Sequence, residues 1–315
     1  MSEIRFDWTQ QEIYGLLTSP LEELTSRAQE IHKKYSRTDI QQCQLMSIKT
    51  GACPEDCGYC SQSAHFETDL ASEPLLPVEK VVDAAKRAKA VGASRFCMGA
   101  AWRDIPQDQR FENVLKMIEG VAATGMEVCC TLGMANGEQL KRMKTAGLTA
   151  YNHNIDTSRE YYPHIVTTRT FAERIETLHM AREAGVQLCS GGILGMGETI
   201  WDRAGMLMEL SSFNPHPESV PINLLVPIEG TPLENSKPVP FEEFLAVVSV
   251  ARILMPQSRV RLSAGRNTLT SDQQKQCFLA GANSIFVGER LLTAPNVDRD
   301  FDMSLLENWD APPPA

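Results

Sequence analysis

The stretch Val91-Gly92-Ala93-Ser94-Arg95-Phe96-Cys97 joins the end of a predicted helix to a short strand through a single glycine. The helix is expected to follow Pro77, because apolar residues then recur at the spacing of one helix face. A glycine directly after a helix supplies the left-handed cap that a tight turn into a strand requires. The same order of helix end, glycine and strand recurs at four further glycines: Gly125, Gly147, Gly185 and Gly281.

This repeat decides the fold class. Five strands follow the five glycines, and the stretches 45–48, 219–224 and 259–263 indicate three more, so eight strands alternate with helices. Eight such units predict an α/β fold, a (β/α)8 TIM-type barrel. The alternative is an open doubly wound sheet, but that fold usually has fewer strands and a glycine-rich phosphate turn, which the sequence does not show.

The expected organisation has three parts. Residues 1–42 keep a helical apolar spacing and form an N-terminal helical extension, and residues 43–297 form the barrel. Residues 298–315, which end in a run of prolines, are expected to be a mobile C-terminal tail.

Composition limits the classes of function. Of the 315 residues, 43% are hydrophobic and 22% charged, and the net charge of −10 argues against nucleic acid as a partner. No apolar run is long enough to cross a membrane, so no membrane partner is expected. Nine cysteines without a secretory leader indicate a reducing compartment and metal chemistry, so we expect a cytoplasmic protein.

A cysteine loop follows the first expected strand directly: Lys49-Thr50-Gly51-Ala52-Cys53-Pro54-Glu55-Asp56-Cys57-Gly58-Tyr59-Cys60. Three thiolates at the spacing C-x3-C-x2-C can hold a cluster of four irons and leave one iron open to a ligand. A zinc site and a disulfide are the alternatives. Structural zinc sites usually bring two separated pairs of ligands, and disulfides suit secreted chains.

Polar and apolar side chains alternate along several expected strands, so each of these strands has one polar face. The apolar face must meet the helices, which directs the polar face into the barrel, where each unpaired neutral group would cost about 2–7 kcal/mol. This interior set includes Cys97, Cys129 and Cys189 on three strands and Arg261 on a fourth. Each cysteine alone can be a small buried hydrophobe, but three together are also compatible with a second metal site.

The cysteine loop resembles the C-x3-C-x-aromatic-C signature of the radical S-adenosylmethionine enzymes. In those enzymes the open iron is chelated by the amino and carboxylate groups of S-adenosylmethionine. Over residues 39–296 the chain resembles one family among them, the biotin synthases. This resemblance rests on six runs: 46–51, 95–102, 151–154, 189–193, 219–223 and 260–266.

The resemblance implies two iron–sulfur clusters. The ligands of a 4Fe-4S cluster would be Cys53, Cys57 and Cys60. A 2Fe-2S cluster, the immediate sulfur donor in this family, would be held by Cys97, Cys129, Cys189 and Arg261. A guanidinium is normally protonated and only donates hydrogen bonds, so an arginine ligand would be a weak and labile corner of the cluster.

The resemblance also implies the residues that bind the organic ligands. The run 191–198 is similar to the G-x-I-x-G-x-x-E element that packs on adenine in radical S-adenosylmethionine barrels, although a flexible turn before a helix is the alternative. Contacts to S-adenosylmethionine would come from Tyr59, Asn154, Asp156, Gly191, Ile193 and Gly195. Dethiobiotin would be bound by Asn154, Asn223 and Thr293.

The implied activity is that of a sulfurtransferase, which inserts sulfur between two unactivated carbons of dethiobiotin to give biotin. It uses a 5'-deoxyadenosyl radical from S-adenosylmethionine and requires a low-potential electron donor such as flavodoxin or ferredoxin. The family suggests a homodimer. Two alternatives stay open. Another radical S-adenosylmethionine barrel, such as a hydrogenase maturase, need not carry the interior cysteines, and a non-catalytic iron–sulfur sensor or carrier would not explain Asn154 and Asp156.

Cys130 departs from the family pattern and makes the third ligand of the second cluster ambiguous. Adjacent residues of a strand face opposite ways. Cys129 shares its face with Glu127 and Thr131, so we predict that Cys129 faces the interior and Cys130 faces the helices. The two remaining cysteines, Cys43 and Cys277, have no implied role and are interpreted as ordinary buried or surface thiols.

Overall fold

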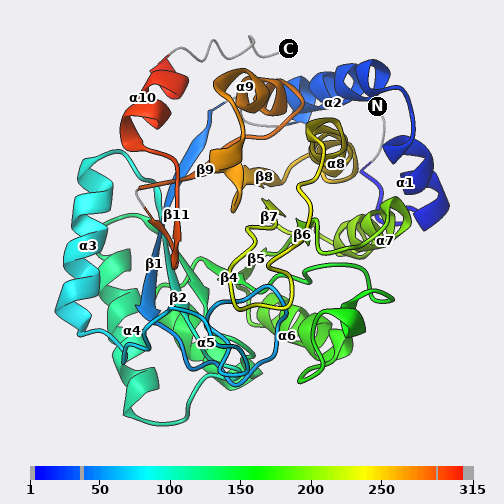
Figure 1. Ribbon diagram of the computed structural model, residues 1–315. Helices are drawn as coiled ribbons and strands as arrows, with labels where there is room; N and C mark the ends of the chain where they lie inside the picture. The colour runs from blue at the N-terminus through cyan, green and yellow to red at the C-terminus, as the bar shows by residue number, and fades with distance from the viewer. Residues whose placement is uncertain (1–3, 36–38, 289, 308–315) are drawn as a thin grey trace.

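Short runs rich in β-branched and apolar residues form a closed parallel barrel in the computed structural model, which describes residues 4–35, 39–288 and 290–307 (Figure 1). The strands are β1 (Gln41–Lys49), β2 (Arg95–Ala100), β3 (Glu127–Thr131), β4 (Ala150–Asn152), β5 (Gln187–Cys189), β6 (Gly192–Leu194), β7 (Ser219–Leu224), β8 (Arg259–Leu262) and β9 (Ser284–Val287). Strands β5 and β6 share one barrel position, and both pair with β7, which closes the sheet. The eight predicted strands are therefore confirmed, and the open sheet is excluded.

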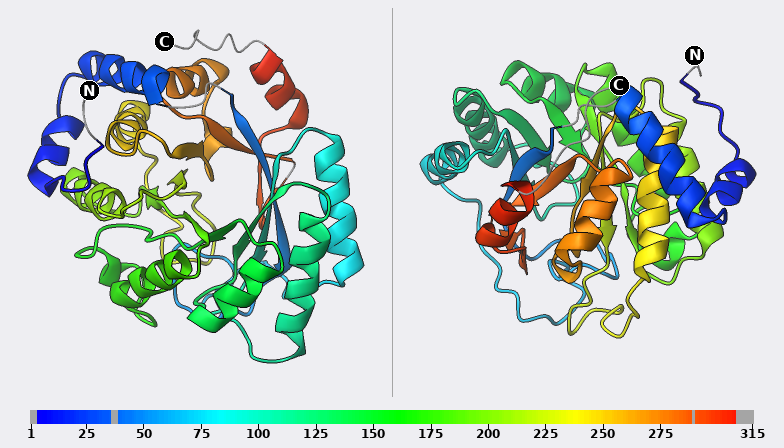
Figure 2. Two further views of the ribbon diagram at one scale, coloured as in Figure 1. Left: turned by 180° about the vertical axis from the view of Figure 1, so that it is seen from behind. Right: turned by 90° about the horizontal axis from the view of Figure 1, so that it is seen from above.

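Helices alternate with the strands and cover the outside of the barrel (Figure 2). They are α3 (Val78–Ala90), α4 (Gln109–Ala122), α5 (Gly137–Thr145), α6 (Phe171–Glu183), α7 (Ile200–Ser211), α8 (Phe241–Leu254) and α9 (Ser271–Leu279). The glycines of the repeat all have positive φ, from 72° at Gly185 to 113° at Gly281, as left-handed caps require. Capping boxes begin several of these helices, for example at Thr170, where the Glu173 carboxylate accepts the backbone N–H of Thr170.

The alternation along the strands separates two groups of buried side chains. Phe96, Met98, Val128 and Cys130 belong to the large apolar layer between strands and helices. Cys97, Cys129 and Cys189 belong to a second, separate cluster inside the barrel, together with Cys43, Ala150 and Phe286. The predicted faces of β2, β3 and β5 are thus confirmed, including the opposite directions of Cys129 and Cys130.

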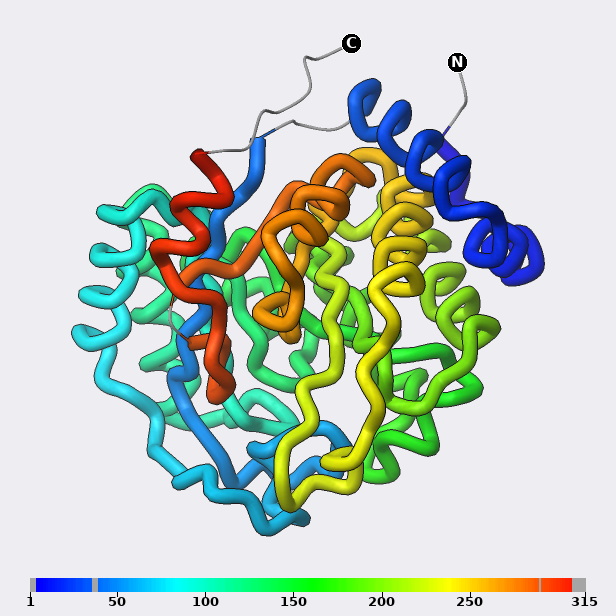
Figure 3. The backbone as a smooth tube through the Cα atoms, turned by 45° about the horizontal axis from the view of Figure 1, so that its top comes forward, coloured from blue at the N-terminus to red at the C-terminus, as the bar shows by residue number. Residues whose placement is uncertain are grey.

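Two helices precede the barrel, as expected: α1 (Gln10–Leu17) and α2 (Leu21–Tyr35). Helix α1 packs against α7 and α2 packs against α8, at the end of the barrel away from the cysteine loop (Figure 3). The expected boundary at residue 43 is two residues late, because β1 already pairs with β9 from Gln41. Within the described residues, no helix has the length and apolar character needed to cross a membrane.

The expectation of a mobile tail from residue 298 is wrong for much of that segment. Residues Arg299–Glu307 form helix α10, after the hairpin of β10 (Arg290–Leu291) and β11 (Ala294–Pro295). The carboxylate of Asp302 is buried and pairs with the buried guanidinium of Arg266 at 2.7 Å. A tertiary ion pair of this kind leaves no signal in the local sequence. Residues 308–315 lie outside the described part of the chain.

His32 links the extension to stability in acid. It is buried in α2, and burial, with Arg252 and Arg259 nearby, lowers its pKa from the ordinary value to about 3. Between about pH 6.5 and pH 3 the unfolded chain takes up a proton that the folded chain refuses, so stability falls as the pH falls through this window. We expect His32→Gln to make the melting temperature of the apoprotein less dependent on pH between 7 and 5. The control is His179→Gln, which replaces an exposed histidine. This variant should keep the wild-type dependence of the melting temperature on pH.

Candidate active site

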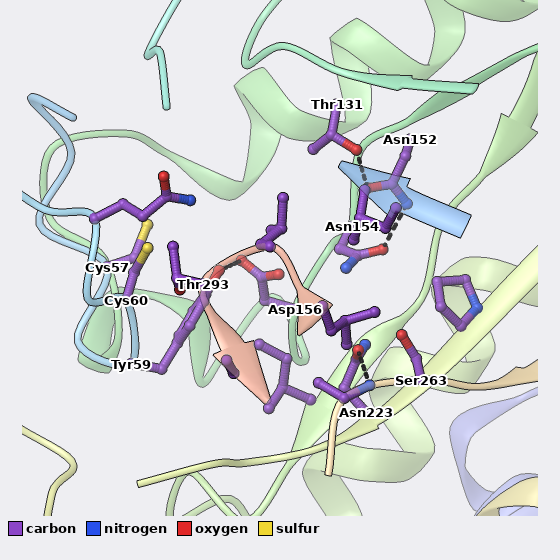
Figure 4. A pocket seen from close by; sticks show the side chains of 18 of the residues that line it. Cys57, Tyr59, Cys60, Thr131, Asn152, Asn154, Asp156, Asn223, Ser263 and Thr293 are labelled. Atoms are coloured by element: carbon purple, nitrogen blue, oxygen red, sulfur yellow. Dashed lines mark hydrogen bonds between the residues drawn. The ribbon is translucent and has the colours of Figure 1, made fainter. Parts of the chain in front are cut away.

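A cavity of about 330 Å³ opens at the carboxyl ends of the barrel strands, where (β/α)8 barrels place their active sites (Figure 4). It is lined by the cysteine loop, by interior residues of the strands and by the hairpin of β10 and β11. All site residues predicted from the sequence line this cavity except Gly191 and Gly195. Residues more than 200 positions apart in the chain, such as Cys53 and Arg261, are therefore brought into one site.

The cysteine loop is held in shape by its own backbone. The N–H of Cys53 donates to Gln62 O at 2.8 Å, and Cys53 O accepts from the N–H of Ala64 at 2.7 Å. The carboxylate of Asp56 accepts the N–H groups of Thr167 and Thr168, which ties the loop to the segment before α6. The loop therefore presents its three thiols on one side without needing a side-chain contact between them.

The three loop thiols lie together at the cavity, and the sulfur atoms of Cys57 and Cys60 lie close to each other (Figure 4). Burial raises the pKa of Cys57, and burial together with Cys57 raises the pKa of Cys60 to about 12. Arg169 is buried beside them, with Nη2 at 3.9 Å from the Cys57 sulfur and Nε at 3.6 Å from the Glu55 carboxylate. A buried cation next to thiols favours their anionic form, the form that binds metal.

Four buried side chains from different strands meet deeper in the barrel: Cys97, Cys129, Cys189 and Arg261. The Nη1 of Arg261 donates to the sulfur of Cys189 at 3.6 Å, and its Nε donates to Ser284 Oγ at 2.9 Å. Strand register places Cys97 directly beside Cys129. The interior thus holds a second group of thiols, separate from the cysteine loop, with a guanidinium at its edge.

Both thiol groups fit an iron–sulfur cluster better than a single metal ion. Among the described residues, no three His, Cys, Asp or Glu side chains surround one point as the ligands of one ion would. In a cluster the thiolates are distributed over two or four irons, so their sulfur atoms need not surround one point. All nine cysteines are free thiols, which removes the disulfide alternative for the loop, and the buried guanidiniums of Arg169 and Arg261 offset the charge of bound thiolates.

Polar residues at the end of β4 form a connected network between the two thiol groups. Asn152 accepts from the Thr131 hydroxyl at 2.9 Å and donates to Asn154 Oδ1 at 3.2 Å, as Figure 4 shows. Asn154 Oδ1 also accepts the N–H of Gly191 at 3.2 Å, so its amide NH₂ is left to face the cavity. Asn152 donates to the Cys189 sulfur at 3.3 Å, which connects this network to the interior thiols.

Asp156 occupies a left-handed backbone conformation with φ of 66°, which is uncommon for a residue other than glycine. Its carboxylate accepts from the Tyr59 hydroxyl at 2.9 Å and pairs with the buried Arg174 at 2.6 Å. Burial alone would lower the pKa of Arg174, but Asp156 raises it above its ordinary value, so the guanidinium stays charged. The strained backbone is consistent with a functional position for Asp156.

The run 191–198 is fixed rather than flexible. Gly192–Leu194 forms strand β6, and the Glu198 carboxylate accepts the N–H groups of Gly195 and Met196 at 2.9 and 2.8 Å. A Cβ on Gly191 would lie 1.9 Å from Pro221 O, so only glycine fits there. Gly191 and Gly195 therefore shape the backbone beside the cavity, while Ile193 lines it.

The residues expected to bind the substrate lie at the wall of the cavity. Asn223 donates to Gly192 O at 2.8 Å and accepts the N–H of Ala264 at 3.1 Å, so its amide is already oriented by backbone. The hydroxyls of Thr293 and Ser61 lie 3.2 Å apart and connect the β10–β11 hairpin to the cysteine loop. Asn223 and Thr293 both line the cavity, so a ligand bound there would contact them.

Sequence reasoning missed several residues of this site, above all Arg169, Arg174 and Asn152. Arg174 lies one turn inside α6, and its partner Asp156 belongs to the loop after β4. The sequence contained one signal for it: Arg174 interrupts the apolar stripe of α6 that faces the barrel. Asn152 shares its strand face with Asn154 and could have been included on that ground.

We predict a large stability cost when the Asp156 carboxylate is removed. Asp156→Asn leaves the guanidinium of Arg174 buried without a counter-charge, which costs about 3–5 kcal/mol in the free energy of unfolding. Denaturant unfolding of the apoprotein measures it. The control is Glu209→Gln, which breaks the more exposed pair with Arg159 and should cost less than about 1 kcal/mol. Equal small losses in both variants would contradict the prediction.

Comparison with known proteins places this site in a class. Residues 47–210 match the family described as the Radical SAM superfamily, and residues 221–311 match the Biotin and Thiamin Synthesis associated domain. The FeFe-hydrogenase maturase HydG from Carboxydothermus hydrogenoformans has 16% identity and a TM-score of 0.80, covering 95% of this chain and 74% of that chain. Methylornithine synthase (PylB) has 20% identity and a TM-score of 0.79, covering 95% and 90%. At these identities the similarity shows the fold alone. Fold, loop and family match together define a radical S-adenosylmethionine barrel enzyme.

Curated relatives narrow the class. The biotin synthase of Sorangium cellulosum is 53% identical over 312 residues, which cover 99% of this chain and 89% of the relative. The biotin synthase of Hyphomonas neptunium is 56% identical over 305 residues, which cover 96% and 95%. The chain belongs to the biotin synthase family and is a sulfur-inserting radical S-adenosylmethionine enzyme.

Proposed function

We propose that this enzyme converts dethiobiotin to biotin at two iron–sulfur clusters held by the two thiol groups of the cavity. The carrying observation is that one cavity is lined both by three thiols of a single loop and by three thiols from separate strands. Cleavage of S-adenosylmethionine needs the first group only. The second group therefore supports sulfur insertion at this site.

The loop thiols Cys53, Cys57 and Cys60 are assigned to a 4Fe-4S cluster, because they are three and a fourth thiolate is absent from the loop. When bound, this cluster with S-adenosylmethionine supplies the 5'-deoxyadenosyl radical. The backbone contacts of Cys53 and Asp56 keep the thiols in place, and Arg169 compensates their charge. The loop residues thus position the cofactor rather than take part in the bond changes.

The S-adenosylmethionine site is assigned to the residues between the two thiol groups. The Asp156 carboxylate suits ribose hydroxyls as an acceptor, and Arg174 and Tyr59 hold it in place. The Asn154 amide, oriented by Asn152 and Gly191, can donate to the nucleoside or to the substrate. The apolar side chain of Ile193 and the backbone at Gly191 and Gly195 form the surface for adenine.

The interior residues Cys97, Cys129, Cys189 and Arg261 are assigned to the 2Fe-2S cluster that donates sulfur. The interior group lies on the far side of Asn152 from the cysteine loop. A substrate bound between the two thiol groups would therefore face both of them. Asn223 and Thr293 are assigned to dethiobiotin, as polar groups on an otherwise largely apolar wall. The hairpin that carries Thr293 lines the cavity, and Thr293 contacts Ser61 just after the cysteine loop. Figure 4 shows Thr293 near the loop thiols.

The proposed reaction also needs partners. Reductive cleavage of S-adenosylmethionine needs an external electron, so a low-potential donor such as flavodoxin or ferredoxin is part of the proposed reaction. We also propose a cytoplasmic homodimer, on the ground of the family resemblance. Size-exclusion chromatography with light scattering tests the dimer, and reduction by purified flavodoxin or ferredoxin tests the donor.

Anaerobic reconstitution followed by product analysis tests the function. We expect two distinct clusters by Mössbauer spectroscopy, and formation of both 5'-deoxyadenosine and biotin when dethiobiotin, S-adenosylmethionine and a reductant are present. Cleavage of S-adenosylmethionine without any biotin would favour a different radical enzyme of this fold. Clusters without any cleavage would favour a sensor or carrier.

A further inference from the structure

Cys43 is a fourth thiol inside the barrel, although the sequence gives it no role. It lies on β1, has no exposed surface, and belongs to the same interior cluster as Cys97, Cys129 and Cys189. Its sulfur is 3.6 Å from Ser284 Oγ and 3.5 Å from Gln41 Oε1. Cys43 is therefore part of the interior site and not an isolated core cysteine.

Cys43 and Arg261 share their neighbours. The guanidinium donates from Nε to Ser284 Oγ at 2.9 Å and from Nη2 to Gln41 Oε1 at 3.4 Å, and these are the two atoms that also contact the Cys43 sulfur. The remaining nitrogen, Nη1, donates to Cys189 at 3.6 Å. The guanidinium thus lies between Cys43 and Cys189, so a group that replaced it would be next to both sulfur atoms.

All three nitrogens of Arg261 act as hydrogen-bond donors in this arrangement. A guanidinium in that state has no lone pair for iron, whereas a thiolate is the ordinary ligand of an iron–sulfur cluster. The fourth ligand position of the interior cluster therefore has two candidates. One is a weak donor that must first lose a proton, and the other is a thiol that shares its position.

A second buried cation indicates that this end of the interior receives negative charge. Arg95 is the register partner of Cys43 on β2, and its Nε pairs with Glu127 at 2.8 Å. Its Nη1 is buried and has no hydrogen-bond partner in the described part of the chain. Arg95 also interacts electrostatically with Cys43, Cys129 and Cys189. An unpaired buried donor beside these three thiols suits a site that is completed by an anionic ligand set.

We propose that Cys43 is a further ligand of the interior cluster, which exchanges with Arg261 at the fourth ligand position. The proposal rests on the proposed function of the interior thiols. If an arginine and a thiolate can alternate at this ligand position, the iron stays bound by the thiolate when the arginine dissociates. Cys130 and Cys277 cannot take this role, because both belong to the apolar layer outside the barrel.

The test compares five full-length proteins after anaerobic reconstitution: wild type, Cys43→Ala, Arg261→Ala, Cys43→Ala/Arg261→Ala and the matched control Cys277→Ala/Arg261→Ala. The readouts are the Mössbauer signal of the two-iron cluster, iron and sulfide per chain, and the rate at which a chelator removes the interior iron. We expect each single variant and the control to keep the interior cluster. The Cys43→Ala/Arg261→Ala variant should lose interior iron to the chelator about tenfold faster than Arg261→Ala.

Equal rates for Arg261→Ala and Cys43→Ala/Arg261→Ala would overturn the proposal, and so would a loss of the cluster in Arg261→Ala alone. Circular dichroism and retained cleavage of S-adenosylmethionine show that each variant folds and keeps the loop cluster. A wild-type chain without any two-iron signal would instead remove the proposed function itself. The failure of each proposal is therefore recognisable on its own.

Discussion

Cys57→Ala abolishes the formation of 5'-deoxyadenosine while the barrel stays folded; this is the largest effect that we expect from any single change. With two thiols left, the loop cannot retain a four-iron cluster, and S-adenosylmethionine has no reductant. Cys53→Ala and Cys60→Ala should behave in the same way. The fold should survive, because the loop is held by backbone contacts at Cys53 and by Asp56 rather than by the thiols.

Anaerobic reconstitution, iron analysis and chromatography of 5'-deoxyadenosine measure this result, and thermal unfolding of the apoprotein checks the fold. Cys277→Ala is the matched control: it also removes a buried cysteine, but one in α9 that packs in the outer apolar layer. Its cleavage activity should equal that of the wild type. Undiminished cleavage in Cys57→Ala would show that the loop thiols are not the site of the radical chemistry.

The fold could be predicted because its signals are local and repeated. A glycine with positive φ ends a helix at Gly92, Gly125, Gly147, Gly185 and Gly281, and a strand follows within a few residues each time. Only a left-handed cap produces this pattern, so each unit supports the others. Helix α10 escaped prediction because its fixed position depends on the ion pair between Asp302 and Arg266, residues that are distant in sequence.

The residues of the candidate site could likewise be predicted only where the signal is local. The interior thiols and Arg261 were predicted to face inward because period-two alternation decides which strand residues point into the barrel, and the structure confirms those faces. Arg169 and Arg174 were missed because they enter from the segment before α6 and from α6 itself, where the helix period carries no information about a charge partner across the barrel. Cys43 was interpreted as an ordinary buried or surface thiol, and it is buried. Its place in the interior group was not predicted, because the strand was expected to begin after it, whereas β1 begins at Gln41 and turns Cys43 inward.

Cys129→Ala should lose the two-iron cluster and biotin formation while some cleavage of S-adenosylmethionine remains. Cys129 is buried in the interior cluster beside Cys97, whereas the loop thiols that bind the other cluster are untouched. Biotin formation should fall below detection, since no other thiol stands at this position of β3. Mössbauer spectra and paired assays of biotin and 5'-deoxyadenosine measure the two effects separately.

Cys130→Ala provides the matched comparison one residue away. Burial, with Cys129 nearby, raises the pKa of the Cys130 thiol well above its ordinary value, and the side chain packs with Val128 and Leu132 in the outer layer. Its loss should cost about 1 kcal/mol of stability and leave both clusters and biotin formation intact. The reverse outcome, with the cluster lost in Cys130→Ala and kept in Cys129→Ala, would mean that β3 is shifted by one residue. Such a shift would also turn Glu127 and Thr131 under the helices, where neither could find a polar partner.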